Sequence, residues 1–520
     1  TYYWSRSIYT RMMLGLDAFH EQVFVAIKDK VANKNDIIEE VAKILFLETF
    51  RIHHLQQTFI VDEQSYLFSD VFNADYVKTN KDKAIKLIKE AFNQLKNHED
   101  YVVTDDEGQQ QAIFDEDTHL LLNRWENYGM LLDLIQNLPA VTDNKNQPVL
   151  GKEKPNLGDV AADVLGRVFD VFLRANFESK GGLGVYLTPA PVKQCMLQMA
   201  MHDIMTETPA LLTANDKKGN PAFRFVDPTC GSYGFGTVAL GYIERALMDC
   251  GWSDSERNRH FQAMLQHSFV GADSAPLMVK LARVNMALLG APKAQIFYTQ
   301  DSLITQQLKT GSFDLICTNP PFGKAKSDIK HILEQFTSDL HEPPKGKGWI
   351  YKPTVNGTAL GGKPNNKGLW KLSSNNIDMS VLFIDRCLSL LKPGGRLLIV
   401  LPDGVLCNSG DRYVREYIMG KKDEESGEFF GGKAIVKAVI SLPADTFKLS
   451  GTGAKTSILY LQKRQAREDE PETFQAEPQQ DVFMAVADTL GYVVKNKVED
   501  YSTGVPNDLA AISGAYVRGD

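Results

Sequence analysis

From about residue 220 onward, short apolar runs alternate with amphipathic segments. The segment after Asp273, for example, places Leu277, Leu281 and Leu288 on one helical face. Strand–helix alternation with near-continuous apolar strands is typical of a mostly parallel sheet that is covered by helices on both faces. The sequence therefore predicts an α/β fold, and the runs predicted as strands are FRFVD (223–227), HSFVGAD (267–273), AQIFYTQD (294–301), FDLICTN (313–319), GRLLIVLPD (395–403), AIVKAVISLP (434–443) and TSILYLQK (456–463).

The N-terminal part of the chain follows a different pattern. Residues 1–150 are predicted to form a helical domain, because apolar residues recur at three- and four-residue steps in 37–50 and 128–138. The turn-rich, polar stretch 142–159 is a predicted boundary, which places a second domain over 155–465.

Two further segments stand apart from the predicted sheet. Residues 324–371 form a Lys- and Gly-rich insertion that is too long for an ordinary connection. Its lysines could contact phosphates, and the alternative is a merely solvated loop. Residues 466–520 begin with a charged, Pro-containing stretch and are predicted to be a linker and a tail that contacts a partner.

Composition limits the class of protein. No apolar run approaches the ~20 residues of a membrane span, and the first residues lack the pattern of a signal peptide. The six cysteines are dispersed without CxxC spacing, which favours a reduced, cytoplasmic protein without a metal site. A net charge of −8 is unusual for a protein that binds nucleic acid unaided.

Acidic residues close three successive predicted strands. Ligands bind beyond the carboxyl ends of the strands in an open parallel sheet. Asp227 precedes a glycine-rich turn that contains Gly231 and Gly234, and Asp273 and Asp301 end the next two strands. Each acid alone is more often a helix cap, but three together predict a binding site. The 46 residues from Asp227 to Asp273 exceed the ~20 of the dinucleotide fingerprint, so NAD is disfavoured.

The sequence TNPPFG follows the fourth predicted strand. The side-chain oxygen of Asn319 can accept a hydrogen bond, while Pro320 and Pro321 restrict the backbone around them. The carbonyl of Pro320 is thereby held in one direction, and Phe322 offers a flat face to a base. Two acceptors on one amino group would leave its nitrogen lone pair directed outward. The alternative is a purely structural role, in which the prolines stiffen a turn and the phenylalanine packs against the protein.

These motifs carry a family resemblance over residues 155–465. The ordered set resembles the S-adenosylmethionine-dependent amino-group DNA methyltransferases, and more narrowly the modification subunit of type I restriction-modification systems. The motifs are FESKGGLGVYLTP (177–189), DPTCGSYGFG (227–236), GADSAPLMVKLARVNMALLG (271–290), DSL (301–303), NPPF (319–322), GGRLLIVLPDGVL (394–406) and ISLPADTFKLSGTGAKTSILYLQK (440–463). Tyr233 departs from the paired glycines that are usual in this family, and its side chain would crowd the cofactor unless it points away.

The resemblance implies a fold, an activity and a set of site residues. It implies a Rossmann-like S-adenosylmethionine-dependent methyltransferase sheet of seven mostly parallel strands, the last antiparallel, with an N-terminal all-helical domain. It implies adenine-specific N6 methylation of flipped bases in double-stranded DNA. The implied catalytic residues are Asn319, Pro320, Pro321 and Phe322; the implied cofactor-binding residues are Thr188, Pro189, Asp227, Gly231, Ser232, Gly234, Asp273, Asp301 and Ser302.

The resemblance also implies partners, and it leaves alternatives open. A separate DNA-specificity subunit is expected to read the base sequence, and a restriction subunit with nuclease and translocase activity is a further candidate partner. Methylation of ribosomal RNA or of a protein amino group, and a non-catalytic assembly role, are the competing interpretations.

Overall fold

The structure is a computed structural model of the 520-residue chain. It describes residues 5–22, 34–104, 108–160, 164–168, 187–323, 362–364, 370–372 and 377–520, except 144, 423, 426, 428, 451, 466–478 and 496–497. Most of the cofactor-tail motif (177–186) and most of the predicted insertion lie outside the described residues. The two described parts of the insertion, β9 (Gly362–Pro364) and β10 (Trp370–Leu372), pair antiparallel.

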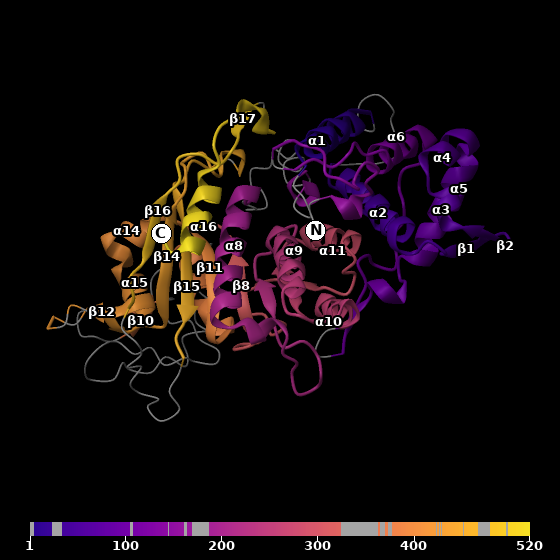
Figure 1. Ribbon diagram of the computed structural model, residues 1–520. Helices are drawn as coiled ribbons and strands as arrows, with labels where there is room; N and C mark the ends of the chain where they lie inside the picture. Colours follow the sequence, from indigo (N-terminus) through magenta and orange to yellow (C-terminus); the bar gives the residue numbers. More distant parts are fainter. Residues whose placement is uncertain are drawn as a thin grey trace.

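An eight-stranded sheet forms the centre of the predicted catalytic region (Figure 1). All seven predicted strands are present, and the order across the sheet is β16-β14-β15-β11-β8-β5-β6-β7. Only β15 runs antiparallel to its neighbours β11 and β14, which confirms the mostly parallel arrangement with an antiparallel last predicted strand. The strands are β5 (Phe225–Asp227), β6 (Phe269–Asp273), β7 (Gln295–Tyr298), β8 (Phe313–Thr318), β11 (Leu391–Pro402), β14 (Ala434–Ser441), β15 (Thr456–Lys463) and β16 (Phe483–Val486).

Helices cover both faces of this sheet because successive strand residues face opposite sides. In β8, Leu315 and Cys317 pack in one core with α8, α9, α10 and α11, whereas Ile316 between them packs in a second core with α13, α14 and α15. The helices are α8 (Ala190–Glu207), α9 (Gly234–Met248), α10 (Asp254–His267), α11 (Pro276–Leu288), α13 (Met379–Leu390), α14 (Asp403–Cys407) and α15 (Arg412–Met419).

The N-terminal region is mainly helical and packs on α11. The two helices predicted from periodicity form as α2 (Lys34–His53) and α6 (Trp125–Gln136), and α2 lies beside α11. The imidazole of His53 contacts the carbonyl oxygen of Leu288 at 2.8 Å. The remaining elements are α1 (Arg6–Glu21), α3 (Phe68–Val71), α4 (Ala74–Asn80), α5 (Asp82–Leu95) and the short hairpins β1–β2 (Thr58–Val61, Gln64–Leu67) and β3–β4 (Val103–Thr104, Gln110–Gln111), which the sequence pattern did not indicate.

The segment expected to be linker and tail contributes elements of its own. β16 adds an eighth strand parallel to β14, and α16 (Asp508–Arg518) packs against α8. Two further short hairpins follow α15 and β16, namely β12–β13 (Gly420–Lys422, Phe429–Gly431) and β17–β18 (Val493–Lys495, Val498–Asp500).

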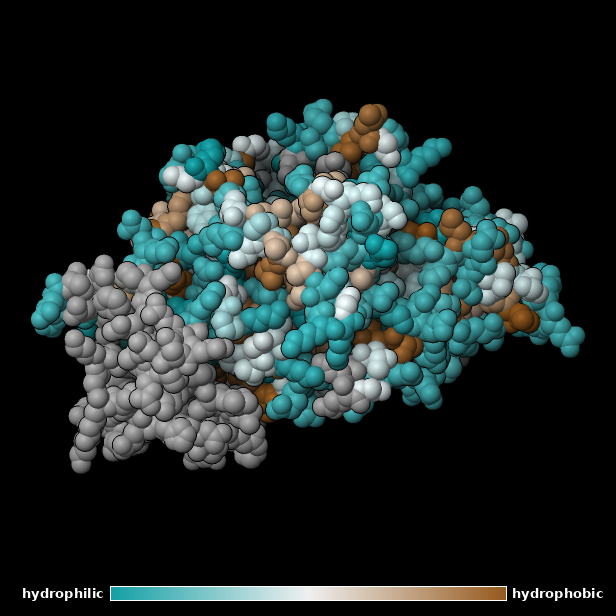
Figure 2. Space-filling model, turned by 60° about the horizontal axis from the view of Figure 1, so that its bottom comes forward, coloured by the Kyte–Doolittle hydropathy of each residue, from teal (hydrophilic) through white to brown (hydrophobic). Residues whose placement is uncertain are grey.

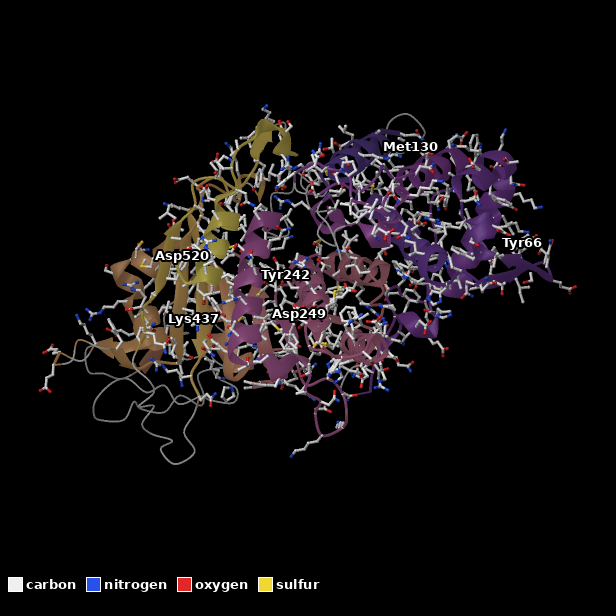
Figure 3. The ribbon with its side chains drawn as sticks, viewed as in Figure 1. Tyr66, Met130, Tyr242, Asp249, Lys437 and Asp520 are labelled. Carbon is white, nitrogen blue, oxygen red and sulfur yellow. The ribbon has the colours of Figure 1, made fainter. Side chains whose placement is uncertain are left out.

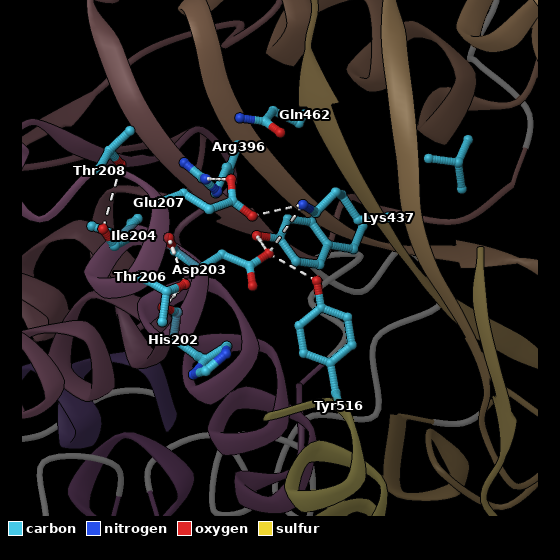
Figure 4. A network of polar contacts seen from close by, with 12 residues as sticks. His202, Asp203, Ile204, Thr206, Glu207, Thr208, Arg396, Lys437, Gln462 and Tyr516 are labelled. Atoms are coloured by element: carbon cyan, nitrogen blue, oxygen red, sulfur yellow. Dashed lines mark hydrogen bonds and ion pairs between the residues drawn. The ribbon is translucent and has the colours of Figure 1, made fainter. Parts of the chain in front are cut away.

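A partly buried polar network joins α8 to the sheet and to α16 (Figure 4). The carboxylate of Asp203 accepts hydrogen bonds from Tyr460 (2.7 Å) and Tyr516 (2.8 Å). Lys437 of β14 contacts Glu207 of α8 at 2.8 Å, and Figure 3 shows Lys437 on one side of α8 and Tyr242 of α9 on the other. The position of α8 is thus fixed from several directions.

The surface is mainly polar. On the face shown in Figure 2, hydrophilic residues predominate and apolar residues lie singly or in small groups. In the part of the chain that the structure describes, no helix has both the length and the apolar character that crossing a membrane requires.

Candidate active site

Asn319 lies directly beyond the carboxyl end of β8, in the middle of the sheet. Its side chain is buried, and its amide nitrogen donates a 3.0 Å hydrogen bond to the hydroxyl oxygen of Thr188. Thr188 precedes α8, so this bond joins two motifs that are 131 residues apart. Because the nitrogen faces Thr188, the oxygen is the amide atom that can accept from an amine.

Asp227 lies at the end of β5, next to β8, and is fully buried. One carboxylate oxygen accepts from the Thr318 hydroxyl at 2.7 Å and from the Thr229 backbone N–H at 3.1 Å. Burial raises the pKa of Asp227 to about 7, although these hydrogen bonds oppose the shift. A buried carboxyl that gains its charge near neutral pH is suited to interact with a cationic group.

The glycine-rich turn connects β5 to the end of β6. The Gly231 N–H donates to one oxygen of Asp273 at 2.8 Å, and the Ala275 N–H donates to the other at 2.9 Å. Gly231 has φ +51°, a conformation that glycine adopts without steric cost. Burial raises the pKa of Asp273. The turn and the second acid therefore form one structural unit.

Ser232 and Gly234 are buried where the turn enters α9. The Ser232 carbonyl accepts a 3.4 Å hydrogen bond from the side-chain amide of Asn285 on α11. A Cβ atom at Gly166 would lie 2.9 Å from the Ser232 hydroxyl oxygen, so a larger residue there would require this hydroxyl to shift.

Tyr233 points away from the strand ends and into the core. Its hydroxyl donates to the Val270 carbonyl at 2.8 Å. Its ring packs edge-to-face on Phe225, with 6.2 Å between the ring centroids. A Cβ atom at Gly236 or Gly271 would lie 2.0 or 2.8 Å from a carbon atom of the tyrosine ring, so these two glycines provide its space. The departure from the family pattern is therefore accommodated inside the fold.

Asp301 and Ser302 follow β7 in a separate turn. The Asp301 carboxylate accepts from the Leu303 N–H at 2.8 Å, and burial raises its pKa. Ser302 is buried, and its carbonyl accepts from Arg386 at 3.1 Å. This acid lies beyond β7, two strands along the sheet from Asp227, and caps its own turn.

Pro320 is buried, whereas Pro321 and Phe322 are half-buried. The ring of Phe322 contacts Phe447 edge-to-face, with 5.4 Å between centroids and 83° between planes. An edge-to-face contact of this kind favours the observed orientation of the Phe322 ring.

The structure brings several predicted residues together and adds others. Asn319 meets Thr188, and Gly231 meets Asp273, whereas Asp301 shares no described hydrogen bond with the other predicted residues. Sequence reasoning missed residues that contact these groups: Thr229, Thr318, Phe447, Asp378 and Arg386. Thr229 had a signal, because a residue two positions after an aspartate commonly donates its N–H to that side chain.

The three carboxylates, as hydrogen-bond acceptors, fit S-adenosylmethionine. A sulfonium and an ammonium group favour a nearby carboxylate, ribose hydroxyls can donate to another, and an exocyclic amine can donate to a third. The three acids lie at the ends of adjacent strands β5 and β6 and in the turn after β7. Within the described ranges, no cluster of three or more His, Cys, Asp or Glu side chains could hold a metal ion.

Comparisons with known proteins match the same region. The N-6 DNA Methylase family matches residues 160–352, and the Eco57I restriction-modification methylase family matches residues 285–434. The Type II methyltransferase M.MamI of Microbacterium ammoniaphilum is 30% identical over 173 residues, which cover 33% of this chain and 43% of that protein. The EcoEI type I restriction enzyme methylase subunit of Escherichia coli is 22% identical over 304 residues, covering 58% and 47% of the two chains.

A solved structure shares the fold. The modification subunit of a putative type I restriction enzyme from Vibrio vulnificus superimposes with a TM-score of 0.54 at 14% identity, covering 99% of this chain and 90% of that one. The chain spans less than half the length of the two curated relatives described above. The predicted resemblance is confirmed: residues 160–352 match the N-6 DNA methylases, and the chain is related to the methylase subunits of type I restriction enzymes.

Proposed function

We propose that this chain transfers a methyl group from S-adenosylmethionine to the N6 amine of adenine in DNA. The observation that carries the proposal is the contact between Asn319 and Thr188, which brings the NPPF motif to the start of α8 beside the acidic strand ends. S-adenosylmethionine supplies an electrophilic methyl group when it is bound.

The proposed roles follow the positions of the residues. Thr188 and Pro189 would hold the methionine end of the cofactor, Asp227 with the glycine-rich turn its centre, Asp273 the ribose and Asp301 the adenine. The Asn319 oxygen and the Pro320 carbonyl accept from the target amine, and Phe322 stacks on the base.

Positioning supplies most of the proposed rate enhancement, because the methyl donor is already activated. Taking adenine out of the duplex costs a few kcal/mol, which stacking on Phe322 and the two hydrogen bonds offset. The acceptors then hold the amine so that its nitrogen faces the methyl group.

We further propose that the chain acts as the modification subunit of a type I restriction-modification system. A separate subunit would read the DNA sequence, consistent with the net charge of −8, and a restriction subunit would bind the assembled complex. Its similarity to the methylase subunits of the EcoEI and EcoKI type I restriction enzymes supports this assignment.

The test is transfer of tritiated methyl groups to DNA, RNA and protein in parallel. We expect label in DNA, with N6-methyladenine as the product. Asn319→Ala should lower turnover about 100-fold, the scale of losing one oriented transition-state hydrogen bond, while cofactor affinity changes little.

Asn137→Ala is the matched control, because Asn137 is exposed at the end of α6, where its side-chain amide donates to nearby Asp133. Label in RNA or protein but not in DNA would refute the proposed substrate. Equal turnover in the Asn319 and Asn137 variants would refute the role of Asn319.

A further inference from the structure

Helix α13 contacts the loops on both sides of the candidate site. It begins after Asp378, and its Arg386 lies two turns further along. One end of the helix binds the loop that follows Phe322, and Arg386 binds the turn that contains Asp301. No role for this helix was expected from the sequence.

Asp378 joins the start of α13 to the NPPF loop. One carboxylate oxygen accepts from the Gly323 N–H at 3.3 Å, and the other accepts from the Ser380 N–H at 2.9 Å. The Met379 N–H donates in return to the Gly323 carbonyl at 2.9 Å. Gly323 directly follows Phe322 and has φ +100°, a backbone conformation that residues other than glycine rarely adopt. The two hydrogen bonds therefore hold the loop in this conformation.

Arg386 joins the same helix to the turn after β7. Its guanidinium donates to the carbonyls of Ser302 (3.1 Å), Thr305 (2.8 Å) and Leu308 (3.0 Å). Burial lowers the pKa of Arg386 to about 10, a value at which it stays charged at neutral pH. Its charge also opposes the rise in the pKa of Asp301 that burial causes.

We infer that α13 couples the two halves of the site: Asp378 positions the loop that ends in Phe322, and Arg386 positions the turn that carries Asp301. Both are positioning residues, because each acts through a loop. The inference rests on the proposed function, which assigns Asp301 to the cofactor adenine and Phe322 to the target base. Arg386 should then act on cofactor affinity, and Asp378 on the handling of the base.

An ordinary structural role would give a different pattern. A helix cap and a buried arginine that only stabilise the fold would, when removed, weaken both properties to a similar degree. Separate effects on the two properties therefore distinguish positioning from general stability.

The first experiment is hydrogen exchange on the full chain without cofactor or DNA. Arg386→Met should speed amide exchange at Leu303 and Thr305, and Asp378→Ala should speed exchange at Gly323 and Met379. Each increase should be about tenfold and confined to its own loop, as local opening predicts. If each variant instead changed amide exchange equally in both loops, the inference would be overturned, whether or not the chain is a methyltransferase.

The second experiment measures S-adenosylmethionine affinity by calorimetry and single-turnover methylation of DNA. Arg386→Met should raise the Kd about tenfold, whereas Asp378→Ala should leave the Kd within about twofold and lower the rate about tenfold. Equal effects of the two variants on both quantities would overturn the inference. A wild-type chain that binds no cofactor would instead overturn the proposed function, and the exchange data would still decide the coupling.

Two matched controls accompany these variants. Arg415→Met removes an arginine of α15 that, like Arg386, donates to backbone carbonyls, here those of Val405 (3.1 Å) and Asn408 (2.9 Å). Asp216→Ala removes an acid that caps an exposed turn by accepting from the Lys218 and Asn220 N–H groups. Both controls should leave affinity and rate unchanged.

Discussion

Replacing Tyr233 with phenylalanine separates a core role from a cofactor role at this position. The ring is fully buried, and its hydroxyl donates to the Val270 carbonyl at 2.8 Å. Removing one such hydrogen bond lowers the free energy of unfolding by about 1 kcal/mol. The ring itself stays in place, so the turn from Gly231 to Gly234 should keep its shape.

Replacing Tyr233 with glycine, the residue type usual in the family, has a larger effect. Removing a buried aromatic side chain lowers the free energy of unfolding by about 3–5 kcal/mol. Glycine adopts the left-handed conformation at this position (φ 66°) without strain, which raises the free energy of unfolding by about 1 kcal/mol. The space between Gly236 and Gly271 would be left empty. The net loss is therefore about 2–4 kcal/mol.

Urea unfolding and calorimetric titration with S-adenosylmethionine are the assays. We expect Tyr233→Phe to unfold at slightly lower urea while its Kd stays within about twofold of wild type. Tyr298→Phe, at a side chain that is 45% exposed, is the control and should unfold like wild type. A tenfold weaker Kd for Tyr233→Phe with unchanged unfolding would refute the reasoning, because the hydroxyl would then act on the cofactor.

Four further predictions follow from the site and its supports. Burial raises the pKa of Asp227 from 3.8 to about 7, so the apo protein should lose stability as the pH rises between these values, because the unfolded chain releases this proton first; urea unfolding of Asp227→Asn should lack that part of the pH slope, and an identical slope would contradict it. Thr188→Val removes the acceptor for the Asn319 amide and should slow single-turnover methylation about tenfold, with Thr188→Ser restoring the rate; equal rates for the two variants would argue against the contact. Phe322→Leu keeps apolar bulk but loses the flat face, which should weaken capture of the base by about 1–3 kcal/mol, and unchanged 2-aminopurine fluorescence in the complex would count against stacking. Tyr516→Phe removes a hydrogen bond to an acid on α8 and should cost about 1 kcal/mol in urea unfolding, a prediction that fails if the midpoint does not move.

Much of the sheet could be predicted because each of the seven predicted strands is an apolar run of its own. β16 was missed because Phe483–Val486 is short and follows a charged, Pro-containing stretch. The run itself is apolar, but it lies at the edge of the sheet, where its residues alternate between half-buried and exposed. Its place in the sheet depends on pairing with β14, which no local pattern specifies.

The residues of the candidate site also fall into two groups, those that the sequence predicts and those that it does not. Asn319, Asp227 and Asp273 could be found because their positions at strand ends follow from the sequence pattern alone. Asp378 and Arg386 could not, because their partners lie 55 and 78–84 residues away in sequence. The inward orientation of Tyr233 likewise depends on two glycines from different elements, which leave room only once the fold is complete.

The position of β15 has a consequence for how the chain folds as it leaves the ribosome. β15 lies between β11 and β14 although it is made after both, and among the described strands β14 pairs with β15 and β16, which are both made later. Strands β5, β6, β7, β8 and β11 have all been made by then. The apolar β14, in contrast, has no pairing partner for the N–H and C=O groups on either of its edges. Until residues 456–463 emerge, this strand is the segment most exposed to mispairing with another nascent chain.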